Sequence, residues 1–175
     1  MKTHIKIVVI YIVLLEVIGY GCSSNKPKIS SELQEYFKNQ VPVRDLNKNF
    51  CIWVDSSNQA DINFGSDMNV VIENLSDQQI FFPLGYGTRL FIVRNNKWVE
   101  IMNSNEYYGN GSILFQKGIQ LGDRISTGIR PVLGPNIKDE GHQEILRIVI
   151  IGELITDGKK TGISVGAYTD VLVNP

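Results

Sequence analysis

Cysteine and histidine, the residues that most often build metal sites and acid–base centres, are scarce in this sequence. Its 175 residues include only two cysteines, Cys22 and Cys51, and two histidines, His4 and His142. Structural zinc sites and disulfide-rich scaffolds need several such residues at short spacing. The sequence therefore favours neither class, and we expect no bound metal and no cofactor.

An excess of charge of either sign is also missing. The chain carries 17 basic and 18 acidic residues, for a formal net charge of −1. A nucleic-acid-binding domain normally shows a strongly basic face, so nucleic acid is not an expected partner. The hydrophobic content of 43% is nevertheless typical of a folded globular domain.

The apolar run at the N-terminus, Ile5 to Ile18, is too short to cross a hydrocarbon core of ~30 Å as a helix. It follows the basic residues Lys2 and Lys6, and it precedes the small residues Gly19 and Gly21 and then Cys22. This order is typical of a secretory signal. An ordinary secretory signal or an uncleaved anchor is the alternative interpretation.

Residues 1–24 resemble a bacterial lipoprotein signal, with residues 1–21 as the signal peptide and Cys22 as the modified residue. The resemblance implies a diacylglycerol thioether on Cys22 with fatty-acyl chains such as palmitate, which would give lasting membrane attachment. It also implies a location in the cell envelope. Ser23 differs from the aspartate that signals inner-membrane retention, so the outer membrane or the cell surface is favoured.

Residues 22–29 are polar and contain Pro27, which predicts a tether, and a short helix is expected over residues 30–40. Ser31 can cap this helix with Gln34 three residues later, and Val41-Pro42 ends it. One face of the helix should pack against the body, because it carries apolar residues at helical spacing: Leu33, Tyr36 and Phe37.

From Phe50 onward the apolar residues recur with a period of two, and turn residues separate the apolar segments. Strands are expected at 50–54, 68–73, 80–83, 89–94, 98–102, 112–116, 124–129, 144–155 and 163–173. Asn95-Asn96-Lys97 is suited to a hairpin turn because asparagine tolerates positive φ. The run at 144–155 should be a central strand, buried on both faces. About eight or nine short strands in one domain, residues 50–175, predict an all-β antiparallel sandwich.

The segment Val70 to Ser76, an aromatic strand after it, and Trp98 after a hairpin turn resemble Ig-like β-sandwich domains of bacterial envelope lipoproteins. In the family pattern a later strand carries a Tyr-Arg pair, where this chain has Leu146-Arg147. The resemblance covers about residues 66–155. It implies an Ig-like fold and brings no catalytic residues.

Three features of the sequence could support chemistry. His142 lies among the carboxylates of residues 138–144, but the spacing matches no known metal loop and favours a solvated turn. The acids of residues 55–63 do not follow the calcium-loop pattern either. Cys51 lies in an apolar strand and is expected to be a buried, inert thiol, the only one left after lipidation of Cys22. We therefore do not expect an enzyme.

Binding is suggested by three loops rich in tyrosine, asparagine and glycine, at 85–88, 103–112 and 134–143. The candidate ligand-binding residues are Tyr86, Tyr107, Tyr108 and Asn110. Trp98 is expected in the core. The three loops would form one surface if they meet at one end of the sandwich.

The sequence thus predicts a lipid-anchored cell-envelope protein whose β-sandwich acts as a binding or structural module. Its expected partners are the membrane, through Cys22, and an envelope protein or glycan. The alternative is a secreted or anchored enzyme inhibitor, or a small hydrolase, that uses the loop at 134–143. A weaker possibility is an assembly subunit that pairs an edge strand with a partner.

Overall fold

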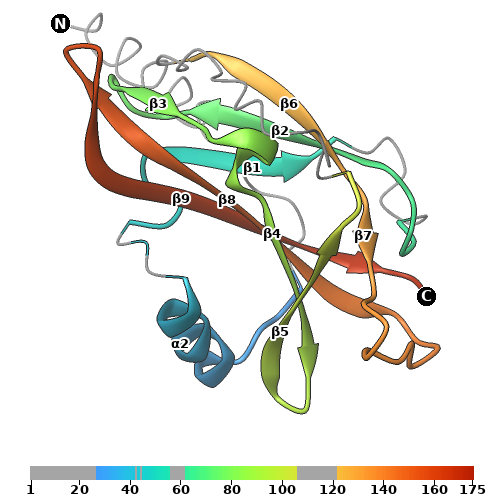
Figure 1. The fold of residues 1–175 in the computed structure, drawn as a ribbon. Coiled ribbons are helices and arrows are strands. Elements are labelled where there is room, and N and C mark those ends of the chain that lie inside the picture. The colour runs from blue at the N-terminus through green and yellow to red at the C-terminus, as the bar shows by residue number, and fades with distance from the viewer. Residues whose placement is uncertain (1–26, 42, 44, 56–61, 106–121) are drawn as a thin grey trace, which may run out of the picture.

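The described residues fold into antiparallel β-sheets with one α-helix on the outside (Figure 1). The computed structural model describes residues 27–41, 43, 45–55, 62–105 and 122–175. In these residues the order is α2 (Ser31–Gln40), β1 (Phe50–Val54), β2 (Met68–Asn74), β3 (Gln79–Phe81), the 3₁₀ turn η2 (Leu84–Gly87), β4 (Arg89–Arg94), β5 (Lys97–Asn103), β6 (Arg124–Ile129), β7 (Pro131–Val132), β8 (Glu144–Thr156) and β9 (Lys159–Val173).

Two sheets make up the body. The smaller has the strand order β1-β2-β6, and the larger has the order β3-β8-β4-β5-β7 with β9 paired to β8. Every ladder between named strands is antiparallel. This confirms the all-β prediction, and each expected strand that falls in the described residues is present. The expected strand at 112–116 lies outside them.

The strand β8 is the centre of the larger sheet. It pairs with β9 along nearly its whole length, while β4 and β3 share its other edge. Its middle residues, from Leu146 to Ile150, are all buried. The prediction of a central strand covered on both faces is therefore confirmed, and the burial of Trp98 is confirmed as well.

Successive residues of β4 show how the larger sheet is covered on both sides. Leu90 and Ile92 belong to the apolar core that also contains residues of the smaller sheet, whereas Phe91 belongs to a second cluster beneath α2. Because side chains alternate across a strand, the sandwich core and the helix lie on opposite faces of the larger sheet. The layers are thus the smaller sheet, the larger sheet and α2.

Two details of α2 differ from the prediction. The N-cap is Ser30, whose Oγ accepts a hydrogen bond from the backbone N–H of Leu33 at 3.3 Å, and Ser31 is the first helical residue. Tyr36 is exposed, whereas Phe37 is fully buried. Leu33 packs partly buried against the same cluster, so two of the three predicted face residues contact the body and Tyr36 does not. The predicted turn at Asn95-Asn96 is confirmed, with φ of 50° and 57°.

Candidate functional site

A cleft opens at the start of β4, where the β4–β5 ladder ends at the pair Leu90–Ile101. Its volume is about 310 Å³. We call it the β4–β5 cleft, and its lining residues are Thr88, Arg89, Leu90, Glu100, Ile101, Met102 and Asn103. The cleft arises because β5 leaves β4 at this point and pairs with β7 through Met102 and Asn103.

One wall of the β4–β5 cleft carries an ordered ion pair. Arg89 donates two hydrogen bonds to the carboxylate of Glu100, at 2.8 and 2.7 Å, and a third to the carbonyl of Gln40 at 3.3 Å. Its guanidinium also lies 5.0 Å from the ring centre of Phe91. The hydrogen bonds to Glu100 raise the pKa of Arg89. A charged group with its position set in advance can orient a polar ligand at low entropic cost.

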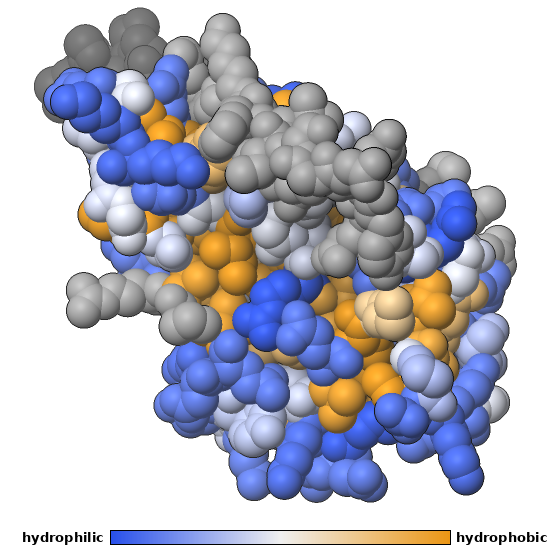
Figure 2. All heavy atoms as spheres, viewed as in Figure 1, coloured by the Kyte–Doolittle hydropathy of each residue, from blue (hydrophilic) through white to orange (hydrophobic). Residues whose placement is uncertain are grey.

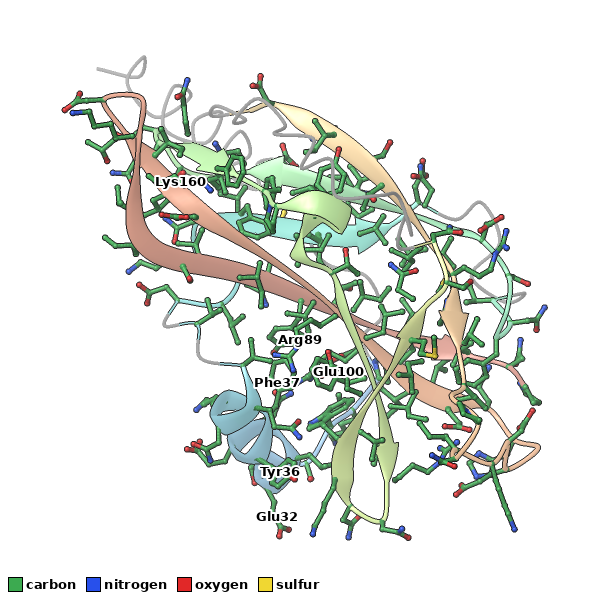
Figure 3. The ribbon with its side chains drawn as sticks, in the orientation of Figure 1. Glu32, Tyr36, Phe37, Arg89, Glu100 and Lys160 are labelled. Carbon is green, nitrogen blue, oxygen red and sulfur yellow. The ribbon has the colours of Figure 1, made fainter. Side chains whose placement is uncertain are left out.

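Apolar side chains surround this ion pair. Figure 2 shows apolar atoms gathered on the face that carries β4 and β5, with hydrophilic atoms between them; Figure 3, in the same orientation, labels Arg89 and Glu100 in the middle of this face. Met102, on β5, is 45% exposed. An exposed methionine beside a fixed charge is suited to contact with an adaptable apolar partner.

The turn that leads into the cleft has an unusual backbone. Gly85, Tyr86 and Gly87 all have positive φ, at 64°, 56° and 58°. A bulky residue such as tyrosine rarely adopts this conformation, and strain of this kind concentrates at functional sites. The ring of Tyr86 is half-buried and lies 5.8 Å from that of Phe82. Tyr86 therefore helps to shape the turn by packing against the core, and it is not among the residues that line the cleft.

The predicted binding loops do not all meet. Thr88, the last residue of the loop at 85–88, and Asn103, the first residue of the loop at 103–112, both line the β4–β5 cleft. The loop at 134–143 lies instead at the far end of β4, beside Arg94. Three of the candidate ligand-binding residues, Tyr107, Tyr108 and Asn110, lie outside the described residues, and so does Cys22.

The loop at 134–143 walls a second cavity of about 270 Å³, lined by Arg94, Asn95, Val99, Asn136, Ile137, Lys138 and Glu140. We call it the loop cavity. His142 lies beside it, and its Nε2 is 3.0 Å from a carboxylate oxygen of Glu140. Among the described residues, no three His, Cys, Asp or Glu side chains are grouped closely enough to hold a metal ion.

A serine in the spacing of a nucleophile elbow was missed by the sequence reasoning. Gly162-Ile163-Ser164-Val165-Gly166 matches G-x-S-x-G, but these residues lie within β9. The elbow requires a sharp turn from a strand to a helix, and β9 simply continues. In the described part of the chain, the hydroxyl of Ser164 forms no hydrogen bond with a base. The match therefore indicates no nucleophile.

A buried arginine is the most unusual polar group in the described structure. The side chain of Arg147, in β8, is fully buried and donates two hydrogen bonds to Asp170 of β9, at 2.7 and 2.8 Å. Its guanidinium carbon lies between 4.1 and 4.4 Å from the centres of three rings, those of Phe37, Trp98 and Tyr168. We call this group the arginine box.

The arginine box fastens α2 to the larger sheet. Phe37 enters it from α2, and Gln34 of the same helix accepts a hydrogen bond from Arg147 at 3.2 Å. The indole N–H of Trp98 donates to the carbonyl of Leu33 at 2.9 Å. Figure 3 shows Phe37 on the sheet side of α2, while Glu32 and Tyr36 point away. Since its own arginine fills the box, it is a structural device and not a ligand site.

The prediction for Cys51 needs correction in one respect. Its burial is confirmed, but the structure has Cys51 disulfide-bonded and not as a thiol. The partner lies outside the described residues. The prediction of a lone thiol assumed that lipid had already consumed the sulfur of Cys22, and the polypeptide by itself carries no lipid.

Comparison with known proteins assigns the chain to no family. No family model matches the sequence, and no curated protein does either. Within the described part of the chain, no helix has the length and apolar character needed to cross a membrane.

Proposed function

We propose that this protein is a lipid-anchored binding module of the bacterial cell envelope, with the β4–β5 cleft as its ligand site. The order of residues in 1–24 supports the anchor, and the two antiparallel sheets are in keeping with an Ig-like sandwich. The observation that carries the proposal is the cleft itself. It places an ordered ion pair and an exposed Met102 where one candidate binding loop ends, at Thr88, and another begins, at Asn103.

The proposed anchor would hold the module close to the membrane. Only about five peptide units join Cys22 to Pro27, a reach of at most about 18 Å. Ile29 already packs against the cluster beneath α2, and the arginine box then fixes α2 to the sheet. The rigid body therefore begins within a few residues of the lipid. A ligand of the cleft would be another component near the same membrane, either an envelope protein or a glycan.

The anchor is tested by metabolic labelling with a clickable palmitate analogue in a host that processes lipoproteins. Label is expected on the wild-type protein and absent from Cys22→Ala, whereas Cys51→Ala should be labelled like wild type. Label that persists in Cys22→Ala, or no label on any form, would reject the anchor. This experiment does not depend on whether the cleft binds anything.

The cleft is tested by site-specific photocrosslinking in intact cells. A photoreactive amino acid replaces Met102 in one variant and, as a matched control, Leu172 of β9, which is 41% exposed. A specific adduct is expected only from position 102, and Arg89→Ala should weaken it. Equal adducts at the two positions, or none at either, would argue against the cleft as a binding site.

A further inference from the structure

The loop cavity is bordered on one side by residues 138–143, which we call the strap, and Lys138 and Glu140 of the strap line it. A chain of charged contacts ties the strap to the end of the sandwich. Arg94 donates to both carboxylate oxygens of Glu144, and its Nε lies 3.5 Å from Glu140. Glu140 in turn lies 3.0 Å from Nε2 of His142. Glu140 is thus held between a permanent cation and a titratable one.

The geometry around His142 favours its doubly protonated form. Nδ1 lies 3.1 Å from the carbonyl oxygen of Gln143, and Nε2 lies 3.0 Å from the carboxylate of Glu140. Both neighbours are acceptors, so both ring nitrogens must carry a proton for the two contacts to be hydrogen bonds. A neutral imidazole has one N–H and can satisfy only one of them.

Among the described residues, the charged groups that contact the strap form one network. Arg94 comes from β4 and Glu144 from β8, and both are largely buried. The strap itself supplies Lys138, Asp139 and Glu140. The Lys138 carbonyl accepts a hydrogen bond from Arg94 at 3.2 Å, and Asp139 accepts one from the Gly141 N–H at 2.8 Å. The one group in the network that titrates near neutral pH is His142.

We propose that residues 138–143 are a pH-responsive strap, which holds the wall of the loop cavity in place when His142 carries both ring protons and loosens when His142 is neutral. Four of the cavity's lining residues lie in the loop that the strap completes: Asn136, Ile137, Lys138 and Glu140. Loss of the imidazolium leaves Glu140 with Arg94 alone. Access to the cavity therefore increases as pH rises. This device is independent of the lipid anchor and of the β4–β5 cleft.

The direction of the pH effect follows from the contacts. The backbone carbonyl of Gln143, and then the carboxylate of Glu140, raise the pKa of His142 above its ordinary value of 6.5. The folded protein therefore binds this proton more tightly than the unfolded chain does. The resulting stabilisation is fully present below the unfolded pKa and is lost as pH rises through the folded pKa.

The test is an NMR titration of residues 22–175, in which His142 is the only histidine. The His142 ring should titrate with a midpoint above 6.5, and the Nε–H signal of Arg94 should shift with the same midpoint. The amide of Ile137, which donates to Gly134 at 2.9 Å, is the reporter of the cavity wall. Its protection from hydrogen exchange, corrected for intrinsic rates, should fall roughly two- to fivefold across that midpoint, the range that an exposed ion pair can supply.

Two conservative variants distinguish loosening of the strap from a titration of His142 that has no structural effect. His142→Gln should remove the transition and keep Ile137 weakly protected at every pH. Glu140→Gln should move the His142 midpoint down toward 6.5 while the fold is retained. The proposal is overturned if His142 titrates but Arg94 and Ile137 respond no more than they do in His142→Gln. A His142 midpoint at or below 6.5 would overturn it as well.

Discussion

Gly87 has no room for a side chain. It has a φ of 58°, and a Cβ added to it would lie 2.3 Å from the carbonyl oxygen of Ile151. The neighbour is backbone of the central strand β8, which cannot move aside without breaking its own pairing. Only glycine fits here, so the turn into the β4–β5 cleft requires a residue without a side chain at position 87.

We therefore expect Gly87→Ala to destabilise the protein strongly. The left-handed backbone costs roughly 1–2 kcal/mol for an alanine, and overpacking against β8 adds roughly 1–3 kcal/mol. Urea unfolding should give a loss in the sum of these ranges. Gly134→Ala is the control, because open space surrounds that position and its φ is not positive. A loss below about 1 kcal/mol for Gly87→Ala, or equal losses for the two variants, would contradict this explanation.

At the residue scale, the sequence predicted local backbone conformation but not contacts between residues that are distant in the chain. Asn95-Asn96 was predicted as a turn from the tolerance of asparagine for positive φ, and it is one. His142 was identified as the unusual residue of its loop, but its link to Arg94 depends on how β4 and β8 pair. Arg147 lies inside an apolar run. Its contacts with aromatic rings could not be predicted from the sequence, because these rings come from α2, β5 and β9.

At the scale of elements, α2 depends on the arginine box. The helix is short, and isolated helices of this length are marginal in water. Arg147 joins it to the sheet through ring contacts and Gln34, while Asp170 neutralises the buried charge. Removing one partner of a buried pair leaves the other without compensation, whereas replacing both by apolar residues is often tolerated.

Arg147→Met should therefore cost about 3–5 kcal/mol of unfolding free energy. It should also make α2 more susceptible to limited proteolysis. The double variant Arg147→Met/Asp170→Leu should recover a large part of the loss, because no charge remains buried. Arg124→Met, at a side chain that is 61% exposed, should change stability by less than about 0.5 kcal/mol.

The arginine box would be of minor importance if Arg147→Met and Arg124→Met behaved alike in urea. A double variant as unstable as the single one would mean that ring packing around the guanidinium, and not charge compensation, holds α2. Proteolysis within residues 31–40 distinguishes these outcomes, because loss of the helix contact exposes that segment before the whole domain unfolds.

Element boundaries followed from the sequence more readily than pairing did. The period of two located each expected strand that lies in the described residues, and the expected helix at 30–40 is α2. The N-cap lies one residue earlier than predicted. Ser30 and Ser31 are both suitable caps, and tertiary contacts through Leu33 and Phe37 determine where the helix starts. The order β3-β8-β4-β5-β7 rests on long-range contacts that no local pattern encodes.

At the scale of the whole molecule, lipidation and disulfide formation exclude each other at the sulfur of Cys22. A thioether to lipid consumes that sulfur, so a lipidated chain with two cysteines can form no internal disulfide. A chain without lipid can keep Cys51 disulfide-bonded, as the structure has it. The thiol content of the purified protein therefore reports the state of its N-terminus.

Protein isolated from the membranes of a lipoprotein-processing host should show one reactive thiol per chain. Denaturant is needed to expose it, because Cys51 is only 4% exposed. A secreted form with an unmodified Cys22 should instead show none before reduction and two afterwards. Titration with a chromogenic disulfide, alongside intact mass, measures both. Cys51→Ala from the same membranes should show no thiol, which confirms the assignment. Membrane-derived protein that lacks a thiol until it is reduced would mean that Cys22 is held by a disulfide and not by lipid.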